Sequence, residues 1–231
     1  MIKVVVFDLD DTLISEAEYV ASGFRTIARS LAGSYPISEG VALEALRRAF
    51  DESPRNVFDR VAAELLPDGS PEVVGALVEA YRTHVPEISF YTDVRPCLEG
   101  LREQGVKTGI LTDGLAVAQH RKLAAVDAAS VVDVIVVSDD LGREDWKPHE
   151  RPFEVARERL GVEFGEMAYV ADNPGKDFAI AARYPISTVR IMREHSVYAG
   201  APYLGGVREA HRINDLADLA TVLGLRPWTE G

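Results

Sequence analysis

The stretch Val4–Leu13 reads VVVFDLDDTL. Its first four residues are apolar and mostly β-branched, which is typical of a strand buried on both faces of a parallel sheet. Three carboxylates follow, and because alternate residues of an extended segment point the same way, we expect Asp8 and Asp10 to share one face. Two carboxylates this close repel each other unless a cation lies between them or one holds a proton. The alternative is an acidic turn in which an aspartate caps the next helix.

The composition is that of a soluble globular protein. The 231 residues are 47% hydrophobic and 27% charged, enough for one large or two modest domains. Lys and Arg number 25 against 37 Asp and Glu, and the net charge of −12 argues against nucleic acid or an anionic membrane as a partner. The single cysteine, Cys97, cannot form an intramolecular disulfide, and the N-terminus lacks a signal segment. We therefore expect a soluble, cytoplasmic protein, either a monomer or a homo-oligomer.

A helical insertion follows the first strand. The next good strand candidate is residues 106–112, although a parallel crossover needs only about a dozen residues. The intervening pattern is helical, with start signals at Ser38, Ser53-Pro54 and Ser70-Pro71. We expect four amphipathic helices in an inserted domain over residues 15–91, with residues 1–14 and 92–231 forming the other domain.

From residue 92 onward, helical and strand patterns alternate. This alternation predicts an α/β fold with an open, doubly wound parallel (Rossmann-like) sheet and the all-helical insertion as a cap domain. Such sheets bind ligands at the carboxyl ends of their strands. The expected strands are 106–112, 131–137, 167–171 and 187–192, and the expected helices are 96–104, 116–125, 151–160 and 216–223.

The residues that close these strands indicate a chemistry. Asp8, Asp10 and, after the fourth strand, Asp172 and Asp177 supply hard carboxylate oxygens. Such ligands suit Mg²⁺, which keeps waters and accepts a substrate phosphate as a further ligand.

A phosphate site is expected beside them. The Thr112 hydroxyl and the turn amides of Asp113 and Gly114 can hold phosphate oxygens at the start of the next helix. Lys147, in the loop after the third strand, can neutralise both a nucleophilic carboxylate and a transferring phosphoryl group.

Four ordered motifs resemble those of the haloacid dehalogenase-like hydrolase superfamily. Each lies at an expected strand end, and together they span residues 4–192. The insertion is similar to the family's C1-type helical cap. The motifs are Phe7–Leu13 (FDLDDTL), Ile110–Gly114 (ILTDG), Trp146–Pro148 with Phe153, and Tyr169–Pro174 (YVADNP) with Asp177.

The resemblance implies a Mg²⁺-dependent phosphatase acting on a small phosphorylated metabolite. Asp8 would attack phosphorus and form an aspartyl-phosphate, and Asp10 would protonate the leaving oxygen and then deprotonate the hydrolytic water. Thr112 would hold the phosphoryl group and Lys147 would balance charge. Mg²⁺ would be held by Asp8, by the backbone carbonyl of Asp10 and by Asp172, directly or through water. Asp177 would be an alternative ligand or would contact a group that binds the metal.

Three positions bear on how closely the chain follows the family. True dehalogenases lack the carboxylate at the position of Asp10, so its presence favours phosphate esters over carbon–halogen bonds. Asp113 replaces the Asn or Ser of many relatives, and an extra carboxylate beside a phosphate weakens its binding unless a partner engages it. Ala171 replaces a glycine that lets the backbone approach closely.

Other functions remain as alternatives. A phosphomutase or phosphotransferase would use the same aspartate but pass the phosphoryl group to another hydroxyl. A non-catalytic sensor would use the pocket to bind a phosphorylated metabolite. A response-regulator-like receiver has similar residues but is shorter and lacks the helical insertion.

Overall fold

The computed structural model describes residues 1–66, 70–194 and 196–228 and divides into two compact units. The core unit comprises Met1–Glu16 and Ser89–Gly231, and the helical unit comprises Ala17–Ile88. The ranges expected for the two domains also contain residues 67–69, 195 and 229–231, which lie outside the described residues. The helical unit is two to three residues shorter at each edge than the expected 15–91 because the two connecting segments pair with each other, at Ile14 and Phe90.

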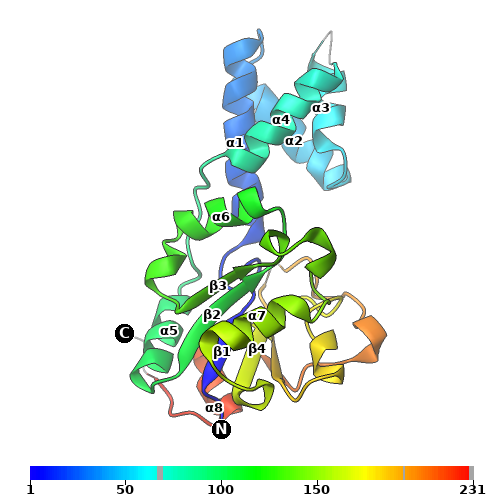
Figure 1. The fold of residues 1–231 in the computed structure, drawn as a ribbon. Helices are drawn as coiled ribbons and strands as arrows, with labels where there is room; N and C mark the ends of the chain where they lie inside the picture. The colour runs from blue at the N-terminus through cyan, green and yellow to red at the C-terminus, as the bar shows by residue number, and fades with distance from the viewer. Residues whose placement is uncertain (67–69, 195, 229–231) are drawn as a thin grey trace. The chain divides into compact units, whose positions relative to one another are not determined.

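The core unit contains a six-stranded, wholly parallel sheet in the order β3-β2-β1-β4-β5-β6 (Figure 1). This confirms the expected doubly wound α/β fold. The central strand β1 pairs with β2 on one side and with β4 on the other, and its side chains have no exposed surface. The strands are β1 (Val4–Phe7), β2 (Lys107–Thr112), β3 (Val134–Val137), β4 (Met167–Ala171), β5 (Ser187–Ile191) and β6 (His211–Ile213).

Helices cover both faces of the sheet. On one face, Val4 and Val6 of β1 join a buried cluster with Phe153 of α7 and with Phe178, in the connection that leads to β5. Because parallel crossovers are right-handed, α5 and α6 cover the other face. The helices of this unit are α5 (Val94–Glu103), α6 (Ala116–Ala125), α7 (Arg151–Leu160) and α8 (Leu219–Leu223).

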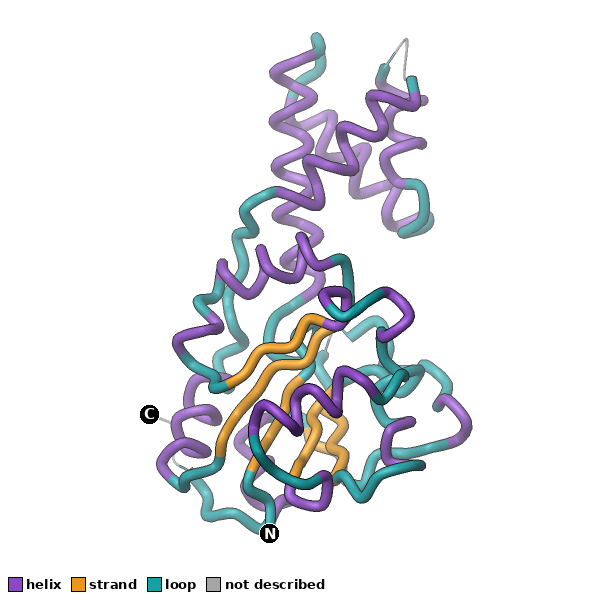
Figure 2. Tube along the Cα trace, viewed as in Figure 1, coloured by secondary structure: helices purple, strands orange, loops and turns teal. Residues whose placement is uncertain are grey.

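The helical unit contains helices and loops only, among the residues described (Figure 2). Its apolar faces meet in one buried cluster that includes Phe24, Ile27, Leu46 and Val61. The Ser38 hydroxyl caps the second helix, as expected, and accepts the Val41 N–H at 3.3 Å. The helices are α1 (Glu16–Ser34), α2 (Glu39–Glu52), α3 (Val57–Leu65) and α4 (Pro71–Thr83).

Two local expectations were wrong. Ser53 does not start a helix: it is extended and ends α2 by donating its N–H to the Ala49 carbonyl, and α3 begins only after Asn56. The third strand begins at Val134 rather than at residue 131, because the N–H groups of Val131 and Val132 donate back to the Ala128 carbonyl and continue the preceding turn. The short edge strand β6 was not expected, since three residues of mixed polarity carry little periodic signal.

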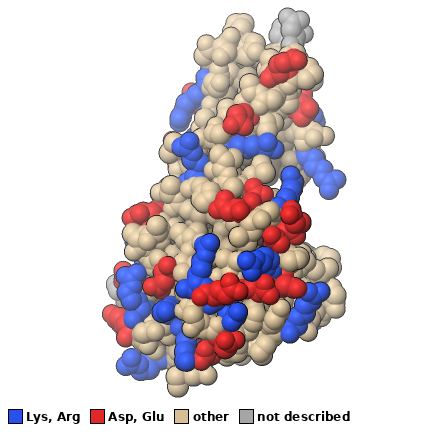
Figure 3. Space-filling view, in the orientation of Figure 1, with Lys and Arg blue, Asp and Glu red and all other residues tan. Residues whose placement is uncertain are grey.

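Acidic and basic side chains are interspersed on the face drawn in Figure 3. Many pair locally, as Arg151 does with Glu154 at 3.6 Å. No helix among the described residues has both the length and the apolar character that crossing a bilayer requires.

We expect Phe153→Ala to destabilise the core unit by about 3–5 kcal/mol, the usual range for emptying a buried aromatic site. Phe153 has no exposed surface and packs edge-on against Tyr169, with ring centroids 4.9 Å apart. Denaturant unfolding followed by fluorescence measures the change. Val117→Ala, at a side chain 42% exposed, is the control and should change the free energy of unfolding by less than about 1 kcal/mol. Equal effects of the two substitutions would contradict the assigned core.

Candidate active site

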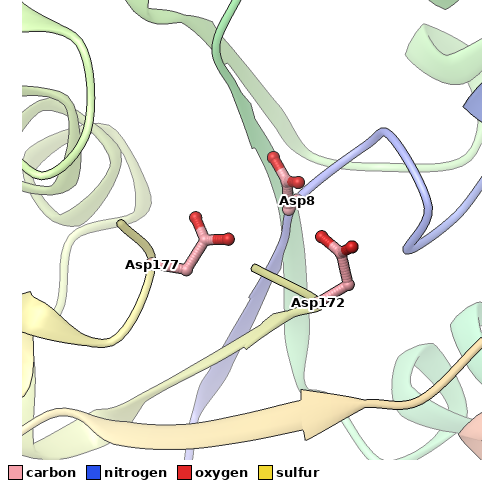
Figure 4. A group of neighbouring side chains, drawn as sticks. All are labelled: Asp8, Asp172 and Asp177. Carbon is pink, nitrogen blue, oxygen red and sulfur yellow. The ribbon is translucent and has the colours of Figure 1, made fainter. Parts of the chain in front are cut away.

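Three carboxylates converge where β1 and β4 end (Figure 4). Asp8 follows β1, Asp172 follows β4, and Asp177 lies in the next turn. Each is buried and offers one oxygen, and the three oxygens lie within 4.8 Å of one another. Among the described residues this is the group of acidic side chains that is arranged to hold a metal ion. Such a group is costly without positive charge nearby, because buried like charges repel.

Lys147 supplies that charge from the loop before α7. Its ammonium has no exposed surface and lies 2.7 Å from Asp8 Oδ1 and 2.8 Å from Asp177 Oδ1. Burial favours the neutral amine, but the two carboxylates outweigh burial and hold the pKa of Lys147 well above its usual range. The lysine is therefore a permanent cation that joins Asp8 to Asp177.

Tyr169 of β4 completes this cluster. Its hydroxyl accepts from Lys147 Nζ at 2.8 Å and donates to Asp177 Oδ1 at 3.2 Å. Burial and the adjacent Asp177 raise the pKa of Tyr169, so the phenol stays protonated and remains a donor. The ammonium thus donates hydrogen bonds to Asp8 and Tyr169 and forms an ion pair with Asp177, and these three contacts fix its position.

Burial raises the pKa of two of the three carboxyls. The pKa of Asp8 rises to about 6, because burial and Asp177 together outweigh Lys147. The pKa of Asp172 rises to about 8, through burial and then the charge of Asp8, although the Ser196 hydroxyl donates to Asp172 Oδ2 at 2.6 Å. A cation placed among these carboxyls would lower both pKa values again, because it favours their ionised forms.

Both oxygens of the Asp113 carboxylate have hydrogen-bond or ion-pair partners in the core unit. Its Oδ1 accepts the Ser138 hydroxyl at 2.6 Å and the Lys147 backbone N–H at 3.1 Å, and its Oδ2 lies 3.1 Å from Lys176 Nζ. Burial raises its pKa, but Lys147 and Lys176 outweigh burial, and the pKa of Asp113 lies below its usual value. The partners that the sequence required for this extra carboxylate are therefore present, and Asp113 orients the backbone that carries Lys147.

Thr112 closes β2 and is fully buried. Its hydroxyl accepts from Gln119 Nε2 at 2.7 Å. Because the oxygen is already an acceptor, the hydroxyl proton is available to donate to another group.

The Asp10 carboxylate is engaged separately from the three converging carboxylates. Its Oδ1 accepts from Lys122 Nζ at 2.8 Å and its Oδ2 from Gln119 Nε2 at 2.9 Å. Lys122 also pairs with Glu16 at 2.6 Å. Burial raises the pKa of Asp10, but Lys122 and Gln119 more than offset burial, so the pKa lies below its usual value.

Part of this network lines a cavity of about 330 Å³ in the core unit. Asp8, Asp10, Asp172, Lys147 and Lys176 line its polar side, together with Asp113 and Gly114. Trp146, Val197 and Tyr198 form part of its apolar wall. The cavity is large enough for a small organic molecule carrying one phosphate.

Most of the residues singled out in the sequence lie close together in the structure. Asp8, Asp172, Asp177 and Lys147 meet in one cluster, and Thr112, Asp113 and Gly114 form the neighbouring strand end. The Asp10 carboxylate lies outside the three-carboxylate group found among the described residues and turns to α6 instead. A metal contact through its backbone carbonyl stays a prediction.

Four contributors were missed by sequence reasoning: Tyr169, Gln119, Lys122 and Lys176. Tyr169 reads as an ordinary residue of a buried strand. Gln119 and Lys122 sit three residues apart on the helix after Gly114, a spacing that places them on one face and was the available signal. Lys176 precedes Asp177 in the turn after β4.

Comparison with known proteins settles the family. A family model described as haloacid dehalogenase-like hydrolase matches residues 5–191. The chain belongs to this family. The match begins in β1 and ends at the last residue of β5, so it contains all four motifs and the helical unit between the first two.

Individual relatives agree with this assignment. The chain is 37% identical to a glyceraldehyde 3-phosphate phosphatase of Methanopyrus kandleri, over 84% of this chain and 85% of that protein. It is 28% identical to (S)-2-haloacid dehalogenase 4A of Burkholderia cepacia, over 86% and 74% of the two chains. The crystal structure of a HAD phosphatase from Thermococcus onnurineus superposes with a TM-score of 0.61 at 28% identity, over 98% of this chain and all of that one (100%).

The donor set suits a hard divalent cation such as Mg²⁺. Asp8, Asp172 and Asp177 offer oxygen ligands only, and two of them have raised pKa values that a cation would reverse. Asp177 also accepts from Lys147, Tyr169 and the Asn173 N–H, which leaves Asp8 and Asp172 as the carboxylates most open to a metal.

We expect Asp172→Asn to stabilise the metal-free protein at alkaline pH. The folded-state pKa of about 8 exceeds the usual 3.8, so stability from the bound proton is complete below about pH 4 and is lost as the pH rises through 8. Asparagine removes this loss. At pH 8.5 in chelator, thermal unfolding of Asp172→Asn should occur at least about 2 °C above wild type.

Added Mg²⁺ should raise the melting temperature of wild type and leave that of Asp172→Asn nearly unchanged. Asp127→Asn, at an exposed carboxylate outside the site, is the matched control and should behave as wild type. A variant that melts below wild type in chelator yet responds fully to Mg²⁺ would contradict the assignment.

Proposed function

We propose that this protein is a Mg²⁺-dependent phosphatase that hydrolyses a small phosphate monoester through an aspartyl-phosphate on Asp8, in the cytoplasm. The observation that carries the proposal is the position of Asp8 at the end of the central strand, 2.7 Å from the buried Lys147 ammonium and beside Asp172 and Asp177. A nucleophilic carboxylate next to a permanent cation and a metal site is what phosphoryl transfer to a side chain requires.

In the first step, an Asp8 carboxylate oxygen attacks phosphorus and the bond to the ester oxygen breaks. Lys147 neutralises charge on Asp8 and on the transferring group, and its partners Tyr169 and Asp177 keep it in place. The free proton of the Thr112 hydroxyl and the turn amides of Asp113 and Gly114 are available to the phosphoryl oxygens. Lys176, also at the cavity wall, adds a second positive charge.

Asp10 acts as the general acid and then as the general base of the reaction. The lowered pKa of Asp10 keeps it ionised in the free protein, so it acts as the acid only after taking up a proton when the anionic phosphate ester binds. As the ester bond breaks, Asp10 gives that proton to the departing oxygen, and the alcohol leaves. The resulting carboxylate then takes a proton from water, whose oxygen attacks the phosphorus of the aspartyl-phosphate. Inorganic phosphate is released, and Asp8 and protonated Asp10 are restored.

The metal would be held by Asp8, the Asp10 backbone carbonyl and Asp172. Asp177 would either bind the metal as well or contact a group that binds it. Bound Mg²⁺ would supply positive charge that lets two acidic groups and a phosphate share the site.

The substrate we propose is a short phosphorylated metabolite. The helical unit, inserted between the first two motifs, would act as a cap that encloses such a substrate during turnover. Glyceraldehyde 3-phosphate is the first candidate, because a relative 37% identical to this chain is named a glyceraldehyde 3-phosphate phosphatase. Asp10 favours phosphate esters over carbon–halogen bonds, despite the similarity to a dehalogenase.

We expect Mg²⁺-dependent release of inorganic phosphate from at least one member of a small panel. The panel contains glyceraldehyde 3-phosphate, phosphoserine, pyrophosphate, a hexose phosphate and a nucleoside monophosphate. Asp8→Asn should lower the turnover number by about a thousandfold or more, since the nucleophile is removed. Phosphate is measured colorimetrically.

Asp127→Asn is the control and should retain wild-type activity. If Asp8→Asn retained full activity, the nucleophile assignment would be wrong. If wild type consumed an ester without releasing phosphate and formed an isomer or a new ester instead, the phosphomutase or phosphotransferase alternative would replace hydrolysis.

A further inference from the structure

The Asp10 carboxylate is held by two side chains of α6, one on each oxygen. Lys122 Nζ lies 2.8 Å from Oδ1 and Gln119 Nε2 lies 2.9 Å from Oδ2. We propose that Gln119 and Lys122 are positioning residues that aim the Asp10 carboxylate for proton transfer to and from the reacting oxygens. This inference rests on the proposed phosphatase function.

Lys122 is built into the core unit rather than placed on its surface. Its side chain is 5% exposed, and it pairs with Glu16 at 2.6 Å as well as with Asp10. Lys122 is the buried member of these two ion pairs, whereas the Asp10 and Glu16 side chains are 26% and 37% exposed. Rotation of Asp10 would take one carboxylate away from a buried ammonium, so the arrangement resists that rotation.

Gln119 connects Asp10 to the phosphate-binding strand end. Its Nε2 contacts the Thr112 hydroxyl at 2.7 Å and the Asp113 carbonyl at 2.6 Å in addition to Asp10. The approach depends on a glycine: a Cβ on Gly114 would lie 3.1 Å from the Gln119 side chain, and the φ of Gly114 is +132°. One amide thus sets the direction of the Thr112 hydroxyl and of the Asp10 carboxylate together.

The purpose of this arrangement follows from the chemistry of Asp10. A proton moves efficiently only between groups within hydrogen-bond reach, and displacement of a reacting group by about 1 Å can cost about a hundredfold in rate. Asp10 directly precedes Asp11, whose φ of +51° belongs to a tight turn. The two donors on α6 restrict rotation of the Asp10 carboxylate.

The test separates protonation of the leaving group from every other step. An alkyl phosphate needs a proton on its departing oxygen, whereas p-nitrophenyl phosphate releases p-nitrophenolate, a stable anion that needs no proton to leave. The ratio of kcat/KM for the two esters therefore reports how well Asp10 is aimed, because kcat/KM covers the steps up to formation of the aspartyl-phosphate. A general loss of folding or metal would lower both values together.

For Lys122→Met we expect kcat/KM to fall about tenfold or more for the best alkyl phosphate of the panel and less than about threefold for p-nitrophenyl phosphate. Lys122→Arg, which keeps a cation on a long stem, should restore most of the ratio. Lys107→Met, at the start of β2, is the matched control and should leave the ratio unchanged, because Lys107 donates to the Leu160 carbonyl, away from the strand ends that form the site.

Two further variants keep the inference testable if Lys122→Met fails to fold. Gln119→Leu removes the donor to the other oxygen of Asp10 and should change the ratio in the same direction. In an Asp10→Asn background, Gln119→Leu or Lys122→Met should change the ratio no further, since the group they aim is gone.

The outcomes are distinct. Equal loss on both esters, no loss on either, or an undiminished effect in the Asp10→Asn background would overturn the positioning role while leaving the phosphatase in place. If wild type released no phosphate in Mg²⁺, or if Asp8→Asn kept full activity, the proposed function would fail, and the positioning role would fail with it.

Discussion

The structure of the core unit depends on one electrostatic constraint: the central strand ends in a carboxylate that is buried with two others. Asp8, Asp172 and Asp177 each have a few per cent of exposed surface or less, at 3%, 2% and 0%. Carboxylates so close and so dry cannot all be ionised without cations. Lys147 meets part of this need by contacting Asp8 and Asp177, whereas burial and the charge of Asp8 raise the pKa of Asp172 to about 8.

The surrounding residues follow from the need to hold that lysine. Lys147 comes from a loop, and loops are less rigid than strands, so its backbone and its ammonium must both be tied. Asp113 accepts its backbone N–H at 3.1 Å, and Tyr169 accepts from its ammonium at 2.8 Å. The carboxylate at position 113, where the resemblance leads one to expect Asn or Ser, thereby has a structural role in holding the loop of Lys147.

A second electrostatic cluster lies next to the first and is kept separate from it. Asp10 is two residues from Asp8, but its carboxylate turns to Lys122 and Gln119 on α6. Two neighbouring aspartates thus have opposite pKa shifts: burial with Asp177 raises the pKa of Asp8 to about 6, whereas Lys122 and Gln119 overcome burial and lower the pKa of Asp10. The lowered pKa keeps Asp10 ionised in the free protein, which suits a base that accepts a proton from water, whereas Asp8 needs the charge of Lys147 or of a further cation to ionise fully.

Much of this could be predicted from the sequence, because the signals are local. A continuous apolar run predicts a buried parallel strand, and the residues after each run necessarily meet at one edge of the sheet. That argument located Asp8, Thr112, Lys147 and Asp172 and the long helical insertion after β1. It failed where local signals were weak or ambiguous, as at Ser53, whose start signal was overridden by the end of α2, and at the three-residue edge strand β6.

The sequence by itself therefore determined the fold class, the strand ends that build the site and the chemical types of the groups collected there. Only the tertiary structure decided which group pairs with which. Three-dimensional packing turned Asp10 to α6, brought Tyr169 onto Lys147 and placed Lys176 on Asp113. The physical reason is that strand periodicity fixes the direction in which a residue leaves the backbone, whereas the partner of a buried charge depends on which distant segments pack beside it.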